Sequence, residues 1–318
     1  MQPQPRSREI RISRPSARVR ASAGRIALRG LEWSGALALA AMLAAAAPAA
    51  AHAQCTPPKS SNEARLLAFY EAPIAFSTSA APTPLPAGAV RVEAEVVPIP
   101  TPSAEISRTG YCFTSKNEHT RLAPVFARPR IVVGLPLGFA FEASYVPPVR
   151  VYDADPNLAS FALSNVRRIP TAPTAPSLAV MLRAHGTIGR VRGPITCPAK
   201  GLQTSDDTLP CFGTRASNDT FHPYQFGGEG ALSLTTRGGR WSLWAGGGVS
   251  WLRPRFQVGF TDANAYTDST RVDVNLVRGS VFGGITAHFT PVVELSASVY
   301  AVPADVTTFR FGAGYRLH

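Results

Sequence analysis

Charged side chains recur at every second position in several stretches that are otherwise apolar or small. Arg91, Glu93 and Glu95 have this spacing, and so do Arg128 and Arg130. Since alternate residues of an extended chain point to the same side, each stretch would carry its charges on one face of a strand. The residues predicted to face one shared interior are Arg91, Glu93, Glu95, Arg128, Arg130, Glu142, Arg183, His185, Glu229, Glu294, Arg310 and Arg316.

Such a set of carboxylates and guanidiniums could do two things. It could neutralise itself as a plug of ion pairs that makes the structure rigid, or it could line a narrow polar path with Glu93, Glu95, Arg128 and Arg130 near the outer mouth. Both alternatives stay open at this stage, because an interior formed by about ten strands is only slightly wider than one that side chains fill.

The opposite faces of the same stretches are apolar. From Phe309 to Leu317 every second residue is apolar, and Trp241 and Trp251 lie on one face of another stretch, in which only Trp244 is out of phase. Ten positions at ~3.4 Å rise and ~40° tilt give roughly 25 Å along a membrane normal, the height of an apolar band between two aromatic girdles. Trp241, Trp251 and Tyr315 are the predicted girdle residues.

The alternation predicts an all-β protein, a single closed antiparallel transmembrane β-barrel of about ten strands. A soluble β-sandwich with the tryptophans in its core is the alternative. In the stretch from 271 to 288 the apolar phase changes, which predicts a bulge near Arg278 and Gly279. The predicted strands are 89–98, 123–135, 138–149, 157–168, 177–191, 221–236, 240–258, 271–288, 292–302 and 305–317.

Residues 1–53 are typical of a signal peptide for general secretion. An Arg-rich start precedes an Ala/Leu run from Ala36 to Ala51, and Ala51-His52-Ala53 is the predicted cleavage site. This segment holds eight basic and two acidic residues, so the formal charge falls from +12 for the whole chain to +6 without it. The remaining basic residues are dispersed, which argues against nucleic acid as a partner.

An N-terminal arm (residues 54–88) is expected before the barrel (residues 89–318). Within it, residues from Asn62 to Tyr70 predict a short capped helix that ends at Pro73, followed by a Pro/Ala/Thr linker. With both chain ends in the periplasm, the four predicted inner turns are short and the two longest connections, 99–122 and 192–220, are outer loops, as in bacterial barrels.

The four cysteines lie after residue 53, and an oxidising envelope permits three pairings. Cys197 with Cys211 is favoured, because it would close a polar loop, and Cys55 with Cys112 would then remain. No C-x-x-C spacing suggests a metal site, and neither a metal nor another cofactor is predicted.

No motif for nucleotide binding, zinc hydrolysis or serine hydrolysis occurs. His222 near Asp219 and His119 near Glu118 are the acid and base pairs considered, and solvated loop residues are the simpler interpretation. The chain is therefore not expected to be an enzyme, and a barrel-embedded hydrolase is the least favoured alternative.

With Phe309, Phe311, Tyr315 and Leu317 in the last strand, the chain resembles the Gram-negative outer-membrane β-barrel superfamily, although His318 replaces the usual final aromatic residue. The segment from Arg130 to Phe139 and the residues from Glu142 to Pro148 are similar to a hairpin of outer-membrane transport proteins for hydrophobic compounds. This second resemblance implies that the helix near Leu66 to Tyr70 acts as a plug.

These expectations combine into a porin-like outer-membrane barrel for passive passage or uptake of small solutes, hydrophobic ones among them, through a narrow, charge-lined lumen. The alternative is a structural or surface-binding barrel with a closed lumen and interaction loops. Expected partners are outer-membrane lipid and lipopolysaccharide, the barrel-assembly machinery and a small solute.

Overall fold

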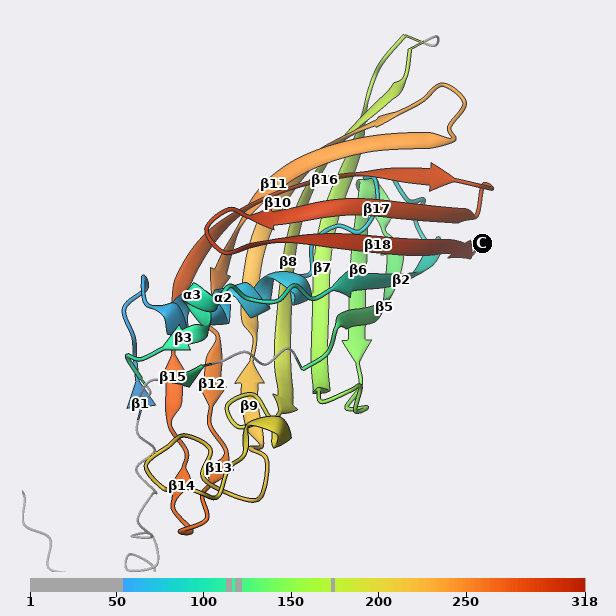
Figure 1. The fold of residues 1–318 in the computed structure, drawn as a ribbon. Helices are drawn as coiled ribbons and strands as arrows, with labels where there is room; N and C mark the ends of the chain where they lie inside the picture. The colour runs from blue at the N-terminus through green and yellow to red at the C-terminus, as the bar shows by residue number, and fades with distance from the viewer. Residues whose placement is uncertain (1–53, 113–115, 118–121, 173–174, 318) are drawn as a thin grey trace, which may run out of the picture. The chain divides into compact units, whose positions relative to one another are not determined.

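The fold is taken from a computed structural model, which describes residues 54–112, 116–117, 122–172 and 175–317 (Figure 1). Within these residues, ten strands form a closed antiparallel ring. In ring order they are β8 (Ser177–Gly193), β10 (Tyr224–Thr235), β11 (Trp241–Leu252), β16 (Leu276–His288), β17 (Val293–Val302), β18 (Val306–Leu317), β2 (Val90–Pro98), β5 (Val125–Gly134), β6 (Phe139–Val146) and β7 (Asp155–Ile169).

Pairing of β7 with β8, from Asp155↔Arg192 to Ile169↔Leu178, closes the ring. Closure matters because an open sheet edge within a membrane would leave backbone hydrogen-bonding groups without partners. The predicted all-β barrel is therefore confirmed. The signal peptide predicted for residues 1–53 and the terminal His318 lie outside the described residues.

Four short connections lie at one end of the ring, and the long loops lie at the other. Leu317, the last described residue, pairs with Val90 at the short-turn end, which also holds the turn containing the 3₁₀ segment Pro136–Gly138. By the usual rule for bacterial barrels the short-turn end is the inner one. The predicted sorting of the loops by length is confirmed by the strand register.

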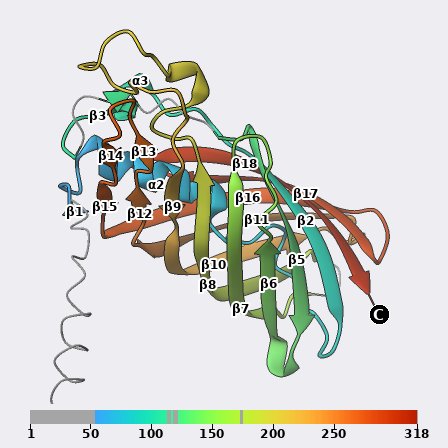
Figure 2. The ribbon, with the colours of Figure 1, turned by 90° about the horizontal axis from the view of Figure 1, so that it is seen from below.

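Three ring strands continue beyond the barrel at the outer end. β9 (Asp219–His222), β12 (Arg255–Gln257) and β15 (Arg271–Asp273) extend β10, β11 and β16 after short interruptions, and β9 also pairs with the end of β8. β1 (Gln54–Cys55) adds a parallel strand to β15 (Figures 1 and 2).

The other small elements belong to the arm and the outer loops. They are α2 (Asn62–Ile74), α3 (Ala104–Ser107), β3 (Arg108–Thr109), β4 (Lys116–Asn117), the 3₁₀ segment Ala199–Gly201, β13 (Phe260–Thr261) and β14 (Thr267–Asp268). No helix in the described part of the chain is long and apolar enough to cross a membrane.

Every ring strand turns large apolar side chains outward. On β11 the exposed residues Trp241, Leu243, Val249 and Trp251 alternate with buried ones, among them Trp244. Exposed apolar residues on the other ring strands are Val92, Ile131, Phe141, Leu163, Leu182, Leu232, Val281, Leu295 and Phe309. An apolar belt around the whole ring far exceeds the patches that soluble proteins tolerate, so hydrocarbon must surround it.

One expectation about the strands is wrong. No bulge occurs at Arg278 and Gly279, because the β11–β16 register runs without interruption from Trp241↔Ala287 to Leu252↔Leu276. The apolar phase changes because the outer part of this wall packs inward against an apolar core, not outward against lipid. Trp244 is out of phase for a similar reason: it faces inward and packs on Phe282, with ring centroids 6.0 Å apart.

Candidate functional site: the lumen arm and the outer apolar cavity

The N-terminal arm runs through the barrel from the outer end to the inner end. It begins at Gln54 beside β15, and Gly88 bonds to Gly134 near the inner turn after β5. The expectation that both ends lie on the inner side is therefore wrong for the start of the arm. Residues 71–82 are all buried, so the arm fills the lumen.

Local chemistry sets the bounds of the arm helix. Ser61 is the N-cap of α2, and its hydroxyl accepts a bond from the Ala64 amide at 3.2 Å. Pro73 lies inside the last turn, one residue before the helix ends at Ile74, so the predicted end was one residue early. Beyond Ile74 the chain is extended, and its carbonyls become available to the barrel wall.

Two guanidiniums from the wall bind the carboxyl end of α2. Arg128 donates to the carbonyl of Ile74 at 2.9 Å and to that of Ala75 at 2.7 Å. Arg310 donates to the carbonyls of Ala72 and Ala75, both at 2.9 Å. The last carbonyls of a helix have no intrahelical partner and carry partial negative charge, so cations stabilise them.

Phe76 lies where three guanidiniums converge. Its ring centroid is 4.2 Å from the Arg130 guanidinium carbon, 4.9 Å from that of Arg128 and 5.0 Å from that of Arg183. Arg183 also donates to the Phe76 carbonyl, and Arg130 donates to the Ser77 carbonyl. Cation–π contacts of this kind gain strength where water is excluded. Sequence reasoning missed Phe76, since a single aromatic residue in a linker gives no periodic signal.

Wall carboxylates balance these guanidiniums. Glu95 contacts Arg128 at 2.7 Å, Arg310 at 3.3 Å and Arg130 at 3.4 Å. The register explains these distances, because Glu95 faces Arg128 directly across β2 and β5. Shared partners of this kind offset the cost of burying each charge.

A second group of ion pairs centres on Arg183 of β8. Arg183 contacts Glu142 at 2.9 Å and Glu229 at 2.7 Å. Glu229 also accepts bonds from the Ser77 hydroxyl at 2.8 Å and from the Thr78 amide at 3.0 Å. His185 lies 4.0 Å from Glu229. Wall charges on this side therefore bind the arm as well.

The residues of the predicted interior set that lie nearest the inner end are Arg91, Glu294 and Arg316. Arg91 contacts Glu93 at 2.6 Å and Glu294 at 3.2 Å. Glu93 accepts a bond from the Ser79 hydroxyl of the arm at 2.5 Å. Arg316 is half-buried, and its Nε has no hydrogen-bond partner within the described residues.

The expected location of four of these residues is wrong. Glu93, Glu95, Arg128 and Arg130 pair with one another midway along β2 and β5, not near the outer mouth. Sequence alternation predicts the strand and the face of each charged residue. It does not predict the depth of the residue in the barrel, because it does not show where each strand enters the membrane.

Glu71 of α2 is a buried carboxyl group that has no guanidinium partner among the described residues. Its Oε1 accepts a bond from the Tyr224 amide at 3.2 Å, and its Oε2 has no hydrogen-bond partner in the described structure. Burial raises the pKa of Glu71 to about 8. The Tyr224 amide follows Pro223, the residue at which β9 and β10 are interrupted, so Glu71 binds the wall where the ladder is broken.

An apolar cavity of about 220 Å³ lies between α2 and the inner wall at the outer end. The helix contributes Leu66, Leu67 and Tyr70 to its lining. The wall and loops contribute Phe126, Val146, Leu158, Val191, Phe221, Phe256, Val272, Leu122, Ala154 and Ile195. In size it falls between the ~150 Å³ cavity that binds benzene and the ~300 Å³ lower limit of typical ligand pockets.

Among the described residues, Glu63 is the one charged residue that lines this cavity, and it is engaged elsewhere. Oε1 of Glu63 accepts bonds from the amides of Gly110, Tyr111 and Cys112 at 2.9, 2.6 and 3.2 Å. The carboxylate therefore fixes the outer loop against α2 and does not face a ligand with an unused charge. An occupant of the cavity would meet mainly hydrocarbon.

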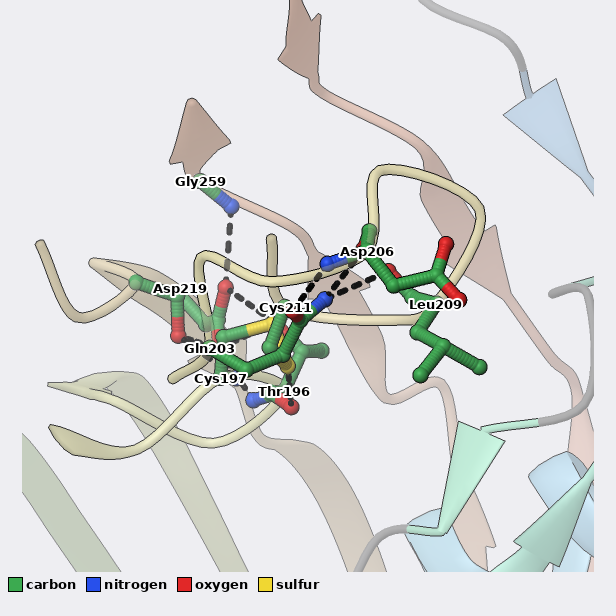
Figure 3. The surroundings of a disulfide bond; sticks show 9 residues. Thr196, Cys197, Gln203, Asp206, Leu209, Cys211, Asp219 and Gly259 are labelled. Atoms are coloured by element: carbon green, nitrogen blue, oxygen red, sulfur yellow. Dashed lines mark hydrogen bonds between the residues drawn. A yellow bond between two sulfur atoms is a disulfide. The ribbon is translucent and has the colours of Figure 1, made fainter. Parts of the chain in front are cut away.

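Two disulfides are present, Cys55–Cys112 and Cys197–Cys211. The first ties the start of the arm to the loop that Glu63 also binds. The second closes the loop after β8, where Asp219 accepts bonds from the Thr196 amide at 2.6 Å and the Gly259 amide at 2.9 Å (Figure 3). Asp219 thus fixes the loops.

The acid and base pairs considered from sequence are not assembled. Asp219 is used by the loop amides, while His222 Nδ1 lies 3.2 Å from the Gly189 carbonyl. The other pair, His119 and Glu118, lies outside the described residues. Among described residues, no group of three or more metal-ligating side chains comes together.

The predicted girdle residues lie at both ends of the apolar belt. Trp241 and Tyr315 are near the inner turns, and Trp251 is at the outer end of β11. All three are about half exposed on the outward face. Aromatic side chains are favoured at the two membrane interfaces.

A closed antiparallel ring with an apolar exterior and a polar interior is the architecture of outer-membrane β-barrel proteins of Gram-negative bacteria, and the chain has that architecture. Barrels of this architecture span the outer membrane.

No protein-family model and no curated protein matches the sequence. Solved structures similar to this chain include Ail, the attachment invasion locus protein of Yersinia pestis, at 9% identity and a TM-score of 0.29, covering 73% of this chain and 99% of Ail. A loop L8 deletion mutant of OmpT, an outer membrane protein of Vibrio cholerae, is 11% identical with a TM-score of 0.22, covering 72% and 76%. A deletion mutant of TodX, a monoaromatic hydrocarbon channel, is 12% identical with a TM-score of 0.26, covering 73% and 68%. These values carry no inference about function.

Proposed function

We propose that this protein lets small hydrophobic solutes pass passively across the outer membrane, with the N-terminal arm as a movable plug. The observation that supports the proposal is the apolar cavity between α2 and the inward face of the barrel wall at the outer end. Its lining favours uncharged solutes, because it offers hydrocarbon and its one carboxylate among the described residues, Glu63, already accepts three amide bonds.

The arm fits the role of a plug because of how it is held. Its helix forms one wall of the cavity, and its carbonyls are bound by guanidiniums that belong to the barrel. A solute that enters the cavity contacts Leu66, Leu67 and Tyr70 of the helix directly. Displacement of the arm would exchange its carbonyls for water at the same guanidiniums, so the ionised wall would stay solvated in the open state.

The proposal is tested by filling the cavity. Ala154→Phe adds a ring to the lining, while Ala159→Phe, a matched control, adds the same ring to the outward face of β7. Uptake of radiolabelled toluene by intact cells that produce the protein should fall severalfold with Ala154→Phe and stay unchanged with Ala159→Phe. Equal uptake by all three proteins, at equal surface levels, would refute the cavity as the entry site.

A structural or surface-binding barrel with a closed lumen is the second candidate. The buried stretch 71–82 of the arm and the arm's tie through Cys55 and Cys112 favour it. The two candidates differ in conductance. A bilayer that stays closed at all voltages, together with toluene uptake no higher than in cells without the protein, would support the binding role.

A further inference from the structure

The wall that rises beyond the barrel has a distinct outward face. Strand alternation explains it: Val191, Phe221, Phe256 and Val272 are register partners on neighbouring strands, and all four line the internal cavity. Residues on either side of them must therefore point out of the barrel.

These outward positions are strongly basic. We call them the basic face, and its members are Arg190, Arg192, Arg253, Arg255 and Arg271. The acidic residues on the same outward rows are Asp155 and Asp273, so the face carries a formal surplus of three positive charges.

Few of these charges are neutralised within the protein. Arg255 contacts Asp273 at 3.2 Å, with 68% of its own side chain exposed. Among described residues, the side chains of Arg190, Arg192 and Arg253 make no hydrogen bond or ion pair. Burial and the nearby guanidiniums of Arg190, Arg255 and Arg271 lower the pKa of His222, which lies among them, although a bond to Gly189 opposes this.

The basic face adjoins the lipid-facing belt. On β11 the exposed Trp251 is followed two positions later by Arg253, and on β8 the exposed Ile188 is followed two positions later by Arg190. Two residues of a strand advance ~7 Å, so the guanidiniums begin where the hydrocarbon ends. Tyr224 and Val277 complete this edge of the belt on β10 and β16.

We propose that the basic face binds the phosphorylated headgroup of an outer-leaflet glycolipid, with Arg190, Arg192 and Arg253 as its principal ligands. Guanidinium groups match phosphate oxygens in geometry and remain charged at any relevant pH. Continuity with the belt favours a lipid over a free anion, because acyl chains can pack on Ile188, Tyr224 and Trp251 while the phosphate meets the guanidiniums. The β17–β18 side ends in the short turn at Pro303 and has no such extension, so the contact is one-sided.

The probe for this proposal is bisphosphorylated lipid A, with binding to the purified full-length protein in detergent measured by native mass spectrometry. The triple variant R190Q/R192Q/R253Q should bind roughly a hundredfold more weakly, at about a factor of five for each guanidinium near an anionic surface. The matched control R168Q/R237Q/R240Q removes three exposed arginines near the inner turns and should bind as the parent does. Heat-modifiable gel migration verifies that each variant is folded.

Three outcomes would overturn the proposal. Equal loss in both triple variants would mean that net charge alone attracts the lipid. Equal binding of dephosphorylated lipid A would assign the affinity to the apolar belt, and competition by inorganic phosphate at the same concentration would point to a free anion. None of these measurements depends on solute passage, so the proposed transport role is tested separately.

Discussion

Arg128→Gln should release the arm, because Arg128 of the wall binds the backbone carbonyls at the carboxyl end of α2. Its two bonds to the carbonyls of Ile74 and Ala75 are lost in the variant, while Glu95 keeps Arg130 and Arg310 as partners at 3.4 and 3.3 Å. At ~1.5 kcal/mol for each bond to a charged donor, the docked arm loses ~3 kcal/mol. The population with a displaced arm should then rise roughly a hundredfold.

Single-channel recording in planar bilayers measures this population as the fraction of time spent in a conducting state. Arg278→Gln is the control, because Arg278 of β16 forms a part-buried ion pair with Asp305 of the β17–β18 turn at 2.7 Å, and neither residue belongs to the arm. Equal opening of the two variants would contradict this prediction, and so would an Arg128→Gln protein that is folded but stays as closed as the parent. Either result would mean that the carbonyl contacts do not hold the arm in place.

Two further predictions concern the same arm. Burial raises the pKa of Glu71 to about 8 from an ordinary value of 4.5. The docked arm therefore holds a neutral carboxyl group, which would ionise in a released arm. Docking of the arm should weaken by at most ~5 kcal/mol as the pH rises from about 4.5 to 8, and its free energy should stay constant above pH 8. Open probability should increase across this window and should be independent of pH in Glu71→Gln; a parent channel without this pH dependence would contradict the buried neutral carboxyl. Loss of the Cys55–Cys112 disulfide in a Cys55→Ser/Cys112→Ser variant should expose the arm to added protease and raise open probability. The control variant Cys197→Ser/Cys211→Ser should change neither property. Protection of the arm in both variants would show that the Cys55–Cys112 disulfide does not retain it.

The strands could be predicted from the sequence because each alternates between two media. Phe309, Phe311 and Tyr315 face hydrocarbon, while Arg310 between them faces the lumen, and a period of two follows directly. The alternation failed where both media are apolar. Val272 and Leu276 point inward to the core around α2, so assigning apolar residues to lipid gave the wrong face.

The path of the arm could not be predicted, because the groups that bind it are backbone carbonyls, which every residue has. Nothing in the sequence distinguishes Ala75, whose carbonyl accepts bonds from Arg128 and Arg310, from other alanines in the same segment. The contacts join residues up to 238 positions apart, since Arg310 binds the Ala72 carbonyl. A local sequence pattern cannot reveal contacts between residues so far apart in the chain.

The composition of the arm nevertheless has a physical explanation once its location is known. A lumen of ten strands leaves little space beside the wall's own arginine and glutamate side chains, so a chain that passes through it must be rich in Ala, Ser, Thr and Pro, as residues 77–86 are. Small side chains let the guanidiniums approach the backbone, and Phe76, the aromatic residue just before this stretch, lies where three of them supply a favourable cation–π environment. A segment with the composition of a flexible linker is thus held firmly, because its partners recognise carbonyls and require that the side chains stay small.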